Sequence, residues 1–379
     1  MIDKLIDKII QNENCMINYA DYMSFVLYDP VIGYYMKDNK KLGREGDFYT
    51  SSGVHAVFGK AFAHFFLDII QKEKLPAVIC EFGGGDGRFA KAVLDEWQRI
   101  APIGMEDLKY SIIETSPFHR QEQKKLLSDK VFFKQFDSLE VFSKSNSNIF
   151  EGIIFSNELL DAFPVHVIEK QNGNIYEVFV SFNEERNQLT EIKKLCNNDN
   201  VLLWIEKYGP KLKDGQRIEV PLYMNDWINS IYQFLSKGFL VTIDYGFTRD
   251  EWMFPQRKKG SLRGYCKHQL VDNPLLYPTE MDLTSHIHLD AYNDVAIEVG
   301  FDKIIDIRQN RFLLMIGMLE FLQENYDPNP FSEKSKQNRA IQTLINDNGI
   351  SSAFHVFLHG KKLTAINSYG FLNDNPYDI

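Results

Sequence analysis

The residues best suited to holding a cofactor form the run Glu81-Phe82-Gly83-Gly84-Gly85-Asp86-Gly87. Glycine lets the backbone turn sharply and lets a ligand approach without meeting a Cβ atom. A dinucleotide fingerprint, G-x-G-x-x-G, would need a glycine at position 88, which is Arg88 here. The missing phosphate cradle favours an adenosine cofactor without pyrophosphate, and S-adenosylmethionine is the common one. The cofactor-binding candidates in this run are Glu81, Gly83, Gly85 and Gly87.

Two acids further along the chain are placed to complete such a site. Glu114 follows an apolar run, and a carboxylate there can accept hydrogen bonds from both ribose hydroxyls. Simple solvent exposure at a strand end is the alternative for this glutamate. Asp137 follows the next apolar run and could reach the adenine amino group.

A second polar group, Asn157, Glu158 and Asp161, follows the apolar run GIIFSNE. Asn157 is a further cofactor-binding candidate. Glu158 and Asp161 lie three residues apart at the start of a predicted single-turn helix, so both can face one site. They are the catalytic candidates, with Asp244 as a third acid nearby. The alternative is a helix cap, in which the helix dipole favours the acids.

Short apolar runs that alternate with helical patterns would bring these residues together. The predicted strands are 77–83, 110–115, 131–136, 152–158 and 238–246, and a helix is predicted over 88–98. Another helix is predicted to open at Ser116-Pro117. A long helix that ends before Pro76 is predicted to pack into the core through an apolar stripe of Val54, Phe58, Phe62, Phe65 and Phe66. Strands alternating with helices favour parallel pairing through right-handed crossovers. The carboxyl ends of parallel strands share one edge of the sheet, where ligands bind. The sequence therefore predicts a three-layer, Rossmann-like α/β fold.

The remaining segments suggest how the chain is divided. Residues 301–318 and 353–360 could close the sheet as an antiparallel pair, and 165–170 with 175–182 read as a hairpin around Asn172-Gly173. We expect an N-terminal helical lobe over 1–75 and a core made of 76–164, 236–247 and 291–362. Substrate-shaping insertions are expected at 165–235 and 248–290, and a tail at 363–379.

Composition limits the classes of protein that fit. No run of about 18 apolar residues is present, so a membrane partner is not expected. The four cysteines form no paired pattern, which suits a reducing environment, and with no secretory signal we expect a cytoplasmic protein. The formal net charge of −10 disfavours nucleic acid as the main substrate. The basic run Arg257-Lys258-Lys259 is interpreted as a solvated loop.

His286, His288 and Asp290 alternate along a predicted strand, with His268 upstream, and invite a metal hypothesis. Histidines that are packed or hydrogen-bonded around an insertion are the preferred interpretation, and no metal is expected.

Several blocks of this sequence resemble the MidA family of methyltransferases. They are LYDPVIGYY (27–35), GREGDFYTSSGVHAVFG (43–59), EFGGGDGRFA (81–90), IIETSPFHRQEQ (112–123), FSNELLDAFPVH (155–166), IDYGF (243–247), GSLRGYCKH (260–268) and PTEMDLTSHIHL (278–289). Two positions depart from the family pattern. Thr279 stands where the family usually has glycine, and His288 where it tends to have aspartate.

The resemblance implies a class I methyltransferase core that transfers a methyl group from S-adenosylmethionine to a protein arginine. It also implies that the GDFYTS loop, with Asp47 and Thr50, closes over the cofactor. Carboxylates suit this acceptor, because they can grip a guanidinium bidentately and fix its plane. The alternatives are a small-molecule N- or O-methyltransferase and an assembly factor that binds the cofactor without turnover. A homodimer is left open.

Overall fold

The structure is a computed structural model that describes residues 2–38, 41, 55–103, 105, 107–145, 149–324 and 329–373. The chain divides into two compact units, each made of three segments. Unit 1 comprises Met1–Phe48, Leu160–Ser230 and Gly246–Glu298, and unit 2 comprises Tyr49–Leu159, Ile231–Tyr245 and Val299–Ile379. Each unit has its own hydrophobic core.

Unit 2 is built on a sheet with the strand order β15-β16-β10-β5-β2-β3-β4. The bounds are β2 (Val78–Phe82), β3 (Lys109–Ile113), β4 (Phe133–Phe136), β5 (Phe150–Asn157), β10 (Leu235–Phe247), β15 (Asp302–Arg308) and β16 (Phe354–Lys361). Neighbours from β10 to β4 pair in parallel, whereas β16 is antiparallel to both β10 and β15. This arrangement confirms the predicted parallel sheet, and the late pair closes it as expected.

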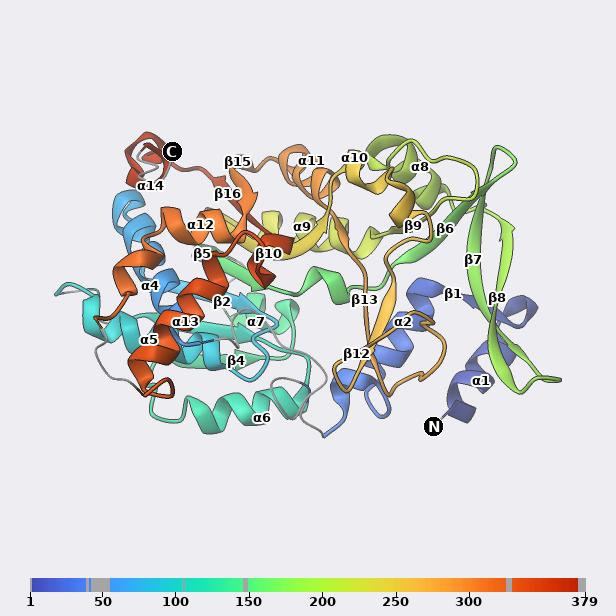
Figure 1. The fold of residues 1–379 in the computed structure, drawn as a ribbon, viewed down its shortest axis with the longest axis horizontal. Coiled ribbons are helices and arrows are strands. Elements are labelled where there is room, and N and C mark those ends of the chain that lie inside the picture. The colour runs from blue at the N-terminus through green and yellow to red at the C-terminus, as the bar shows by residue number, and fades with distance from the viewer. Residues whose placement is uncertain are drawn as a thin grey trace. The chain divides into compact units, whose positions relative to one another are not determined.

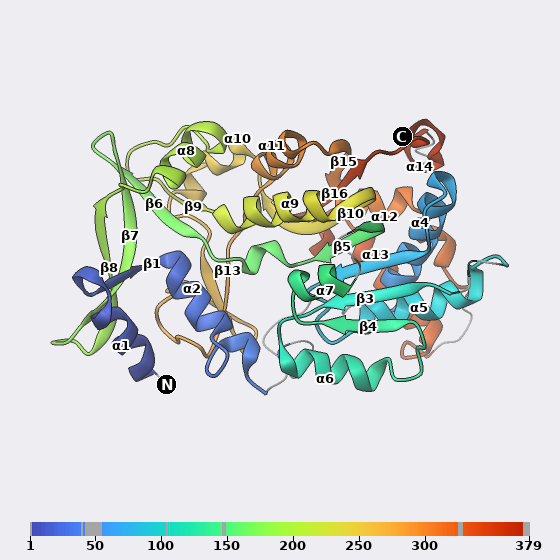
Figure 2. The same ribbon diagram turned by 180° about the vertical axis from the view of Figure 1, so that it is seen from behind.

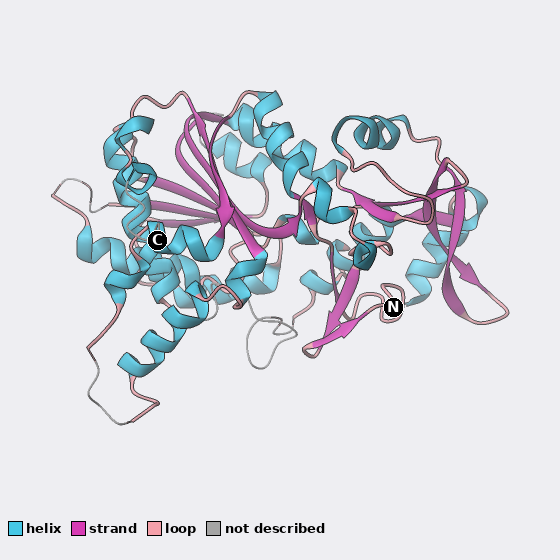
Figure 3. Ribbon diagram, turned by 45° about the horizontal axis from the view of Figure 1, so that its top comes forward, coloured by secondary structure: helices cyan, strands magenta, loops and turns pink. Residues whose placement is uncertain are grey.

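Helices lie against both faces of this sheet (Figure 3). They are α4 (Val57–Glu73), α5 (Arg88–Ile100), α6 (Pro117–Leu126), α7 (Leu139–Ser145), α12 (Gln309–Met315), α13 (Glu333–Ile345) and α14 (Gly370–Asn373), with 3-10 turns η5 (Met318–Phe321), η6 (Ile350–Ala353) and η7 (Ile366–Ser368). Ser116 caps α6 as predicted, because its hydroxyl accepts a hydrogen bond from the His119 N–H at 3.3 Å. The three-layer α/β architecture is therefore present.

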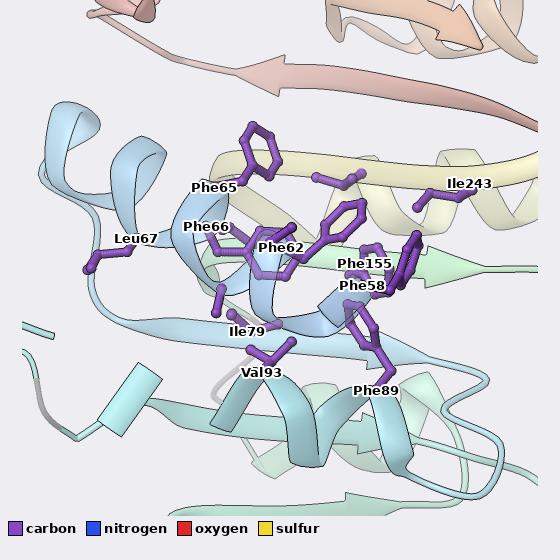
Figure 4. Packing of buried hydrophobic residues seen from close by; sticks show 14 of the residues in the cluster. Phe58, Phe62, Phe65, Phe66, Leu67, Ile79, Phe89, Val93, Phe155 and Ile243 are labelled. Atoms are coloured by element: carbon purple, nitrogen blue, oxygen red, sulfur yellow. The ribbon is translucent and has the colours of Figure 1, made fainter. Parts of the chain in front are cut away.

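The apolar stripe predicted for the long helix packs onto the sheet. Phe62 on α4 is fully buried, and its ring contacts Phe155 of β5 and Phe89 of α5 at centroid distances of 5.5 and 5.8 Å (Figure 4). The helix thus belongs to the core of unit 2. The N-terminal lobe expected over residues 1–75 included this helix. In the structure, the buried phenylalanines pack α4 against the strands of unit 2.

Unit 1 contains a five-stranded and a three-stranded sheet. The first has the order β1-β7-β6-β9, with β8 paired to β7, and the second has the order β12-β11-β13. The bounds are β1 (Met16–Asn18), β6 (His166–Gln171), β7 (Asn174–Asn183), β8 (Gln188–Leu195), β9 (Arg217–Val220), β11 (Arg263–Cys266), β12 (Gln269–Val271) and β13 (Asp282–Thr284). The predicted hairpin is confirmed as β6–β7, and Asn172 and Gly173 turn it with φ of 49° and 80°.

Helices α1 (Ile2–Gln11) and α2 (Tyr19–Tyr28) contact the five-stranded sheet at β7 (Figures 1 and 2). The other elements of this unit are α8 (Asp199–Tyr208), α10 (Arg249–Trp252), α11 (Leu289–Val299), β14 (Ile287–His288), and the 3-10 turns η1 (Glu13–Cys15), η2 (Tyr34–Met36), η3 (Leu160–Ala162) and η4 (Pro255–Arg257). Helix α9 (Leu222–Phe234) runs from unit 1 into unit 2.

The segments of unit 1 leave the core chain directly after β5 and at the end of β10. The first insertion was expected to begin at residue 165, and it begins at Leu160. Among the described residues, no helix combines the length and apolar character needed to cross a membrane.

Candidate methyl-donor site

The glycine run forms a tight turn between β2 and α5. Gly83, Gly85 and Gly87 have φ of 67°, 52° and 84°, a region that other residues enter only at a cost. Gly84 is required for a different reason, since a Cβ atom there would lie 2.7 Å from Cγ2 of Ile112 on β3. The turn is therefore narrow, and it presents backbone in place of side chains.

Two side chains beyond β3 hold this turn in place. Oε2 of Glu114 accepts a hydrogen bond from the Gly85 N–H at 3.2 Å, and Oε1 accepts one from the Ser116 N–H at 2.8 Å. Nε2 of Gln123 donates to the Gly85 carbonyl at 2.7 Å. Glu114 is buried and not merely exposed at a strand end. A carboxylate has about four acceptor positions, so Glu114 can still accept from a ribose.

Glu81 lies behind the turn on β2. It is buried, and the Tyr110 hydroxyl donates a hydrogen bond to its carboxylate at 2.9 Å. Burial raises the pKa of Glu81 to about 8, and the charges of Glu114 and Asp86 act in the same direction. The Glu81 carboxyl is therefore largely protonated at neutral pH.

The end of β5 lies beside the glycine turn. Phe82 of β2 pairs with Ser156 of β5, so Asn157 lies one residue beyond the last residue of β5 that pairs with β2. A Cβ atom on Gly83 would lie 2.9 Å from Cδ1 of Leu159. Oδ1 of Asn157 is buried, and no described residue donates a hydrogen bond to it. A buried acceptor without a donor is unfavourable, so this oxygen fits a position that a ligand would satisfy.

Glu158 has an unusual backbone. Its φ is 52°, although it is not glycine, and its N–H donates to the Ile243 carbonyl of β10 at 2.9 Å. Nδ2 of Asn157 donates to Oε1 of Glu158 at 3.1 Å. A strained residue that the surrounding strands hold in place is typical of functional sites.

The predicted arrangement of Glu158 and Asp161 on one helical face is wrong. The single turn is the 3-10 helix η3, which begins at Leu160, after Glu158 has already left helical geometry. Asp161 belongs to unit 1, where it is buried and its carbonyl accepts from the Ser285 N–H at 2.8 Å. The three-residue spacing argument fails because only one of the two residues is helical.

The third predicted acid, Asp244, is completely buried on β10 and accepts a hydrogen bond from the Tyr245 N–H at 2.9 Å. Asp137 is exposed after β4, where the Ser138 hydroxyl donates to it at 3.2 Å. Asp47 and Thr50 lie outside the described residues.

Sequence reasoning missed an acid–tyrosine group in unit 1. The Tyr35 hydroxyl donates to the buried Asp282 carboxylate at 2.6 Å, and the Tyr28 ring stacks on Tyr35 at 5.5 Å. Burial raises the pKa of Tyr35 well above its usual value, and the charges of Asp282 and Asp161 contribute. Tyr28, Tyr35 and Asp282 all lie within the quoted family blocks, and only that resemblance could have indicated them.

The histidines of the late block are engaged in other contacts. The His288 ring stacks on Trp252 at 4.4 Å, and its Nε2 hydrogen-bonds the Glu219 carbonyl at 2.7 Å. Asp290 accepts from the Arg249 N–H at 2.5 Å. Within the described parts of the chain, no group of three or more His, Cys, Asp or Glu residues is placed to hold a metal ion.

Residues 61–305 match the family described as "Putative S-adenosyl-L-methionine-dependent methyltransferase". The match spans more than half of the chain, and the chain belongs to this family. The resemblance to MidA methyltransferases is thereby confirmed, as is S-adenosylmethionine as the cofactor.

Named relatives extend over most of the chain. The mitochondrial protein arginine methyltransferase NDUFAF7 of Danio rerio is 24% identical over 374 residues, covering 90% of this chain and 82% of the relative. The homolog from Caenorhabditis elegans is 26% identical over 346 residues, covering 83% and 75%.

A crystal structure from Burkholderia thailandensis, titled a "likely methyl transferase" bound to S-adenosyl-homocysteine, has a TM-score of 0.85 at 24% identity. The match covers 96% of this chain and 92% of the Burkholderia thailandensis chain. At this identity the likeness confirms the fold alone.

The expectation of a cytoplasmic protein is contradicted by these comparisons. The relatives from Danio rerio, Caenorhabditis elegans and Homo sapiens are each named as mitochondrial. Unpaired cysteines indicate a reducing environment, but they do not identify one compartment.

We predict that Gly85→Val abolishes cofactor-induced stabilisation. A ligand at a hundred times its Kd stabilises a protein by about 2.7 kcal/mol, so S-adenosyl-homocysteine should raise the Tm of the wild type, whereas NAD should not. A β-branched residue at this positive φ would distort the turn and occupy ligand space. The control is Gly173→Val in the β6–β7 hairpin of unit 1, where φ is also positive and no atom lies within 4 Å of the added Cβ. This variant should have a lower Tm and keep the cofactor-induced shift. Unchanged cofactor affinity in Gly85→Val would contradict the assignment.

We predict a pH-dependent loss of stability that originates at Glu81. The pKa of Glu81 rises from the ordinary value of 4.5, which applies to the unfolded chain, to about 8 in the folded protein. The contribution of Glu81 to the free energy of unfolding is therefore fully present below about pH 4.5 and is lost as the pH rises through 8. In this window the wild type should lose up to about 1.4 kcal/mol per pH unit relative to Glu81→Gln. Urea denaturation at about pH 6 and about pH 8 measures the difference. Glu184→Gln, at an exposed position, is the control, and parallel curves for wild type and Glu81→Gln would refute the assignment.

Proposed function

We propose that this chain transfers a methyl group from S-adenosylmethionine to an arginine side chain of a protein. Glu158 is the observation on which the proposal rests, because a carboxylate is held with strained backbone at the end of β5, beside the cofactor turn. The relatives named as protein arginine methyltransferases support the choice of acceptor.

The proposed cofactor contacts are those of the glycine turn and the neighbouring strand ends. The residues are Gly83, Gly85, Gly87, Glu114, Asp137 and Asn157, with Glu81 behind the turn and Asp47 and Thr50 from the undescribed loop. The cofactor fits this group because the turn lacks Cβ atoms and the buried Asn157 Oδ1 has no described donor. When bound, S-adenosylmethionine supplies a methyl group on a positively charged sulfur.

The acids would act on the acceptor. An arginine side chain stays protonated, with a pKa above about 12, so it must be oriented and must release a proton as its nitrogen gains the methyl group. A carboxylate that binds two guanidinium nitrogens fixes the plane and leaves a third nitrogen exposed. We assign this orienting role to Glu158, with Asp161 and Asp244 as supporting acids. The segments of unit 1 would shape the substrate site.

The experiment that tests the acceptor incubates the protein with radiolabelled S-adenosylmethionine and a lysate from cells lacking it. We expect a labelled protein band that yields methylarginine after hydrolysis. Label confined to small molecules would support a small-molecule methyltransferase. No label at all would support a cofactor-binding assembly factor.

We predict that Glu158→Gln retains cofactor affinity and loses turnover by two or more orders of magnitude, on the order of 3 kcal/mol. The amide keeps the shape of the side chain but cannot pair with a guanidinium charge. Single-turnover rates measure the loss, and Asp161→Asn is expected to have a milder effect.

Glu158→Gly is the matched variant for the backbone. Glycine relieves the positive φ, so this variant should unfold no more easily than wild type while its turnover falls as in Glu158→Gln. A normal rate in Glu158→Gln, or a loss of stability in Glu158→Gly, would argue that Glu158 is structural.

A further inference from the structure

Two arginines of unit 1, Arg257 and Arg263, are half-buried. No carboxylate in the described parts of the chain forms an ion pair with either guanidinium. Arg217 in the same unit shows the usual pattern, since it pairs with Glu191 at 2.7 Å. Neither guanidinium of this pair is neutralised by a carboxylate of the described residues, so an acidic group of a ligand would meet uncompensated positive charge here.

Aromatic rings hold the Arg257 guanidinium in place. Its Cζ lies 3.7 Å from the centroid of the Phe247 ring and 5.3 Å from that of Phe254. Its Nη1 donates to the Glu251 carbonyl at 2.8 Å. Stacking fixes the plane of the Arg257 guanidinium but leaves its positive charge in place. The N–H donors other than the one bonded to Glu251 have no acceptor among the described residues.

Arg263 belongs to the same stack through His286. The His286 ring lies parallel to Phe247 at 4.2 Å, and Nη2 of Arg263 is 3.3 Å from Nε2 of His286. Burial lowers the pKa of His286 to about 3, and both arginines contribute to the shift. The imidazole is therefore neutral and can accept the hydrogen bond from Arg263.

Arg263 also has a buried donor with no acceptor. Its Nε has no hydrogen-bond partner among the described residues, and neither has the hydroxyl of Thr284, which lies directly opposite on β13. Opposite residues of an antiparallel pair share one face of the sheet, so both groups point to the same side.

A rigid support positions this arginine. The buried Glu219 carboxylate accepts hydrogen bonds from the N–H and hydroxyl of Ser261 and from the Leu262 N–H, at 2.8 to 3.2 Å. These contacts fix the two residues that precede Arg263. The backbone that carries Arg263 is thus held before any ligand arrives, and the contact with His286 holds its guanidinium.

We propose that Arg257 and Arg263 bind a carboxylate of the methyl acceptor, namely an aspartate or glutamate side chain of the protein that carries the target arginine. The proposal rests on the proposed protein-arginine acceptor. Two planar guanidinium groups, with N–H donors that have no acceptor among the described residues, match the bidentate geometry of a carboxylate. A polyanion fits less well, because the chain carries a net charge of −10.

Calorimetry with two synthetic peptides tests this site in the full-length protein with S-adenosyl-homocysteine present. Both peptides carry one arginine, flanked on each side by aspartates in one and by asparagines in the other. The wild type should bind the aspartate peptide about tenfold more tightly or better, as expected for a charge-assisted bidentate contact. Equal affinities in the wild type would overturn the proposal.

Variants localise the effect. Arg263→Gln and Arg257→Gln should each lose most of the preference while retaining affinity for the asparagine peptide, and Arg263→Lys should recover only part of it. Lys259→Gln removes one charge from the same loop at an exposed position and should keep the preference. Equal losses in all variants would indicate a general charge effect and would overturn the site.

A probe that needs no arginine separates this proposal from the proposed function. The Nε–H resonance of Arg263, followed by NMR with ¹⁵N-labelled arginine, should shift on titration with acetate and respond less in Arg257→Gln. If acetate shifts it but neither peptide is methylated, the anion site stands and the arginine acceptor is wrong. No response to acetate, or a response to inorganic phosphate alone, would overturn the carboxylate assignment.

Discussion

The left-handed turn between β2 and α5 is the constraint on which the rest of the candidate site depends. Three residues of the turn need positive φ, so the chain must place glycines there, and glycines do not hold a loop still by themselves. Glu114 and Gln123 supply the missing rigidity through hydrogen bonds to the backbone of Gly85. The neighbouring strand and helix therefore determine the shape of the surface offered to a cofactor.

Near this turn, some buried polar groups have hydrogen-bond partners, and one has none among the described residues. The core strands of unit 2 bury apolar side chains on paired backbone, and the buried Asp244 accepts a hydrogen bond from its neighbour. One residue beyond the pairing of β2 with β5, the Asn157 oxygen has no described donor, and Glu158 follows with strained backbone. Such costs persist only where the surrounding structure enforces them, which favours the end of β5 as the place where chemistry occurs.

The sequence predicted the core well because its signals are local. Apolar runs gave β2, β3, β4, β5 and β10, and the Ser116-Pro117 pair gave the start of α6. Glu114 was found from its position after a strand, but its bond to Gly85 depends on a turn formed 29 residues earlier in the chain. Gln123 ends the family block 112–123, but its role depends on the packing of α6 against the glycine turn, which no local pattern shows.

Other predictions were wrong because a spacing in the sequence was taken to fix the positions of side chains in three dimensions. Glu158 and Asp161 are three residues apart, yet the positive φ of Glu158 takes it out of the turn that begins at Leu160. The apolar stripe on α4 was predicted correctly, but the helix was assigned to the N-terminal lobe and not to the core of unit 2. Periodicity shows that a helix has an apolar face without showing which element covers that face. The basic run at Arg257 was interpreted as a solvated loop, and only the stack on Phe247 distinguishes that arginine from Lys258 and Lys259.

The division of chemistry between the two units follows from how the chain is threaded. Unit 2 carries the glycine turn and Glu158. The segments of unit 1 leave the core after β5 and at the end of β10, the edge where ligands bind in a parallel α/β sheet. These segments are the part of the chain that we propose encodes differences in acceptor. In the proposed anion site, two arginines that form no ion pair with a described carboxylate would let a chain of net charge −10 discriminate among acceptors by their charge pattern, in addition to the presence of an arginine.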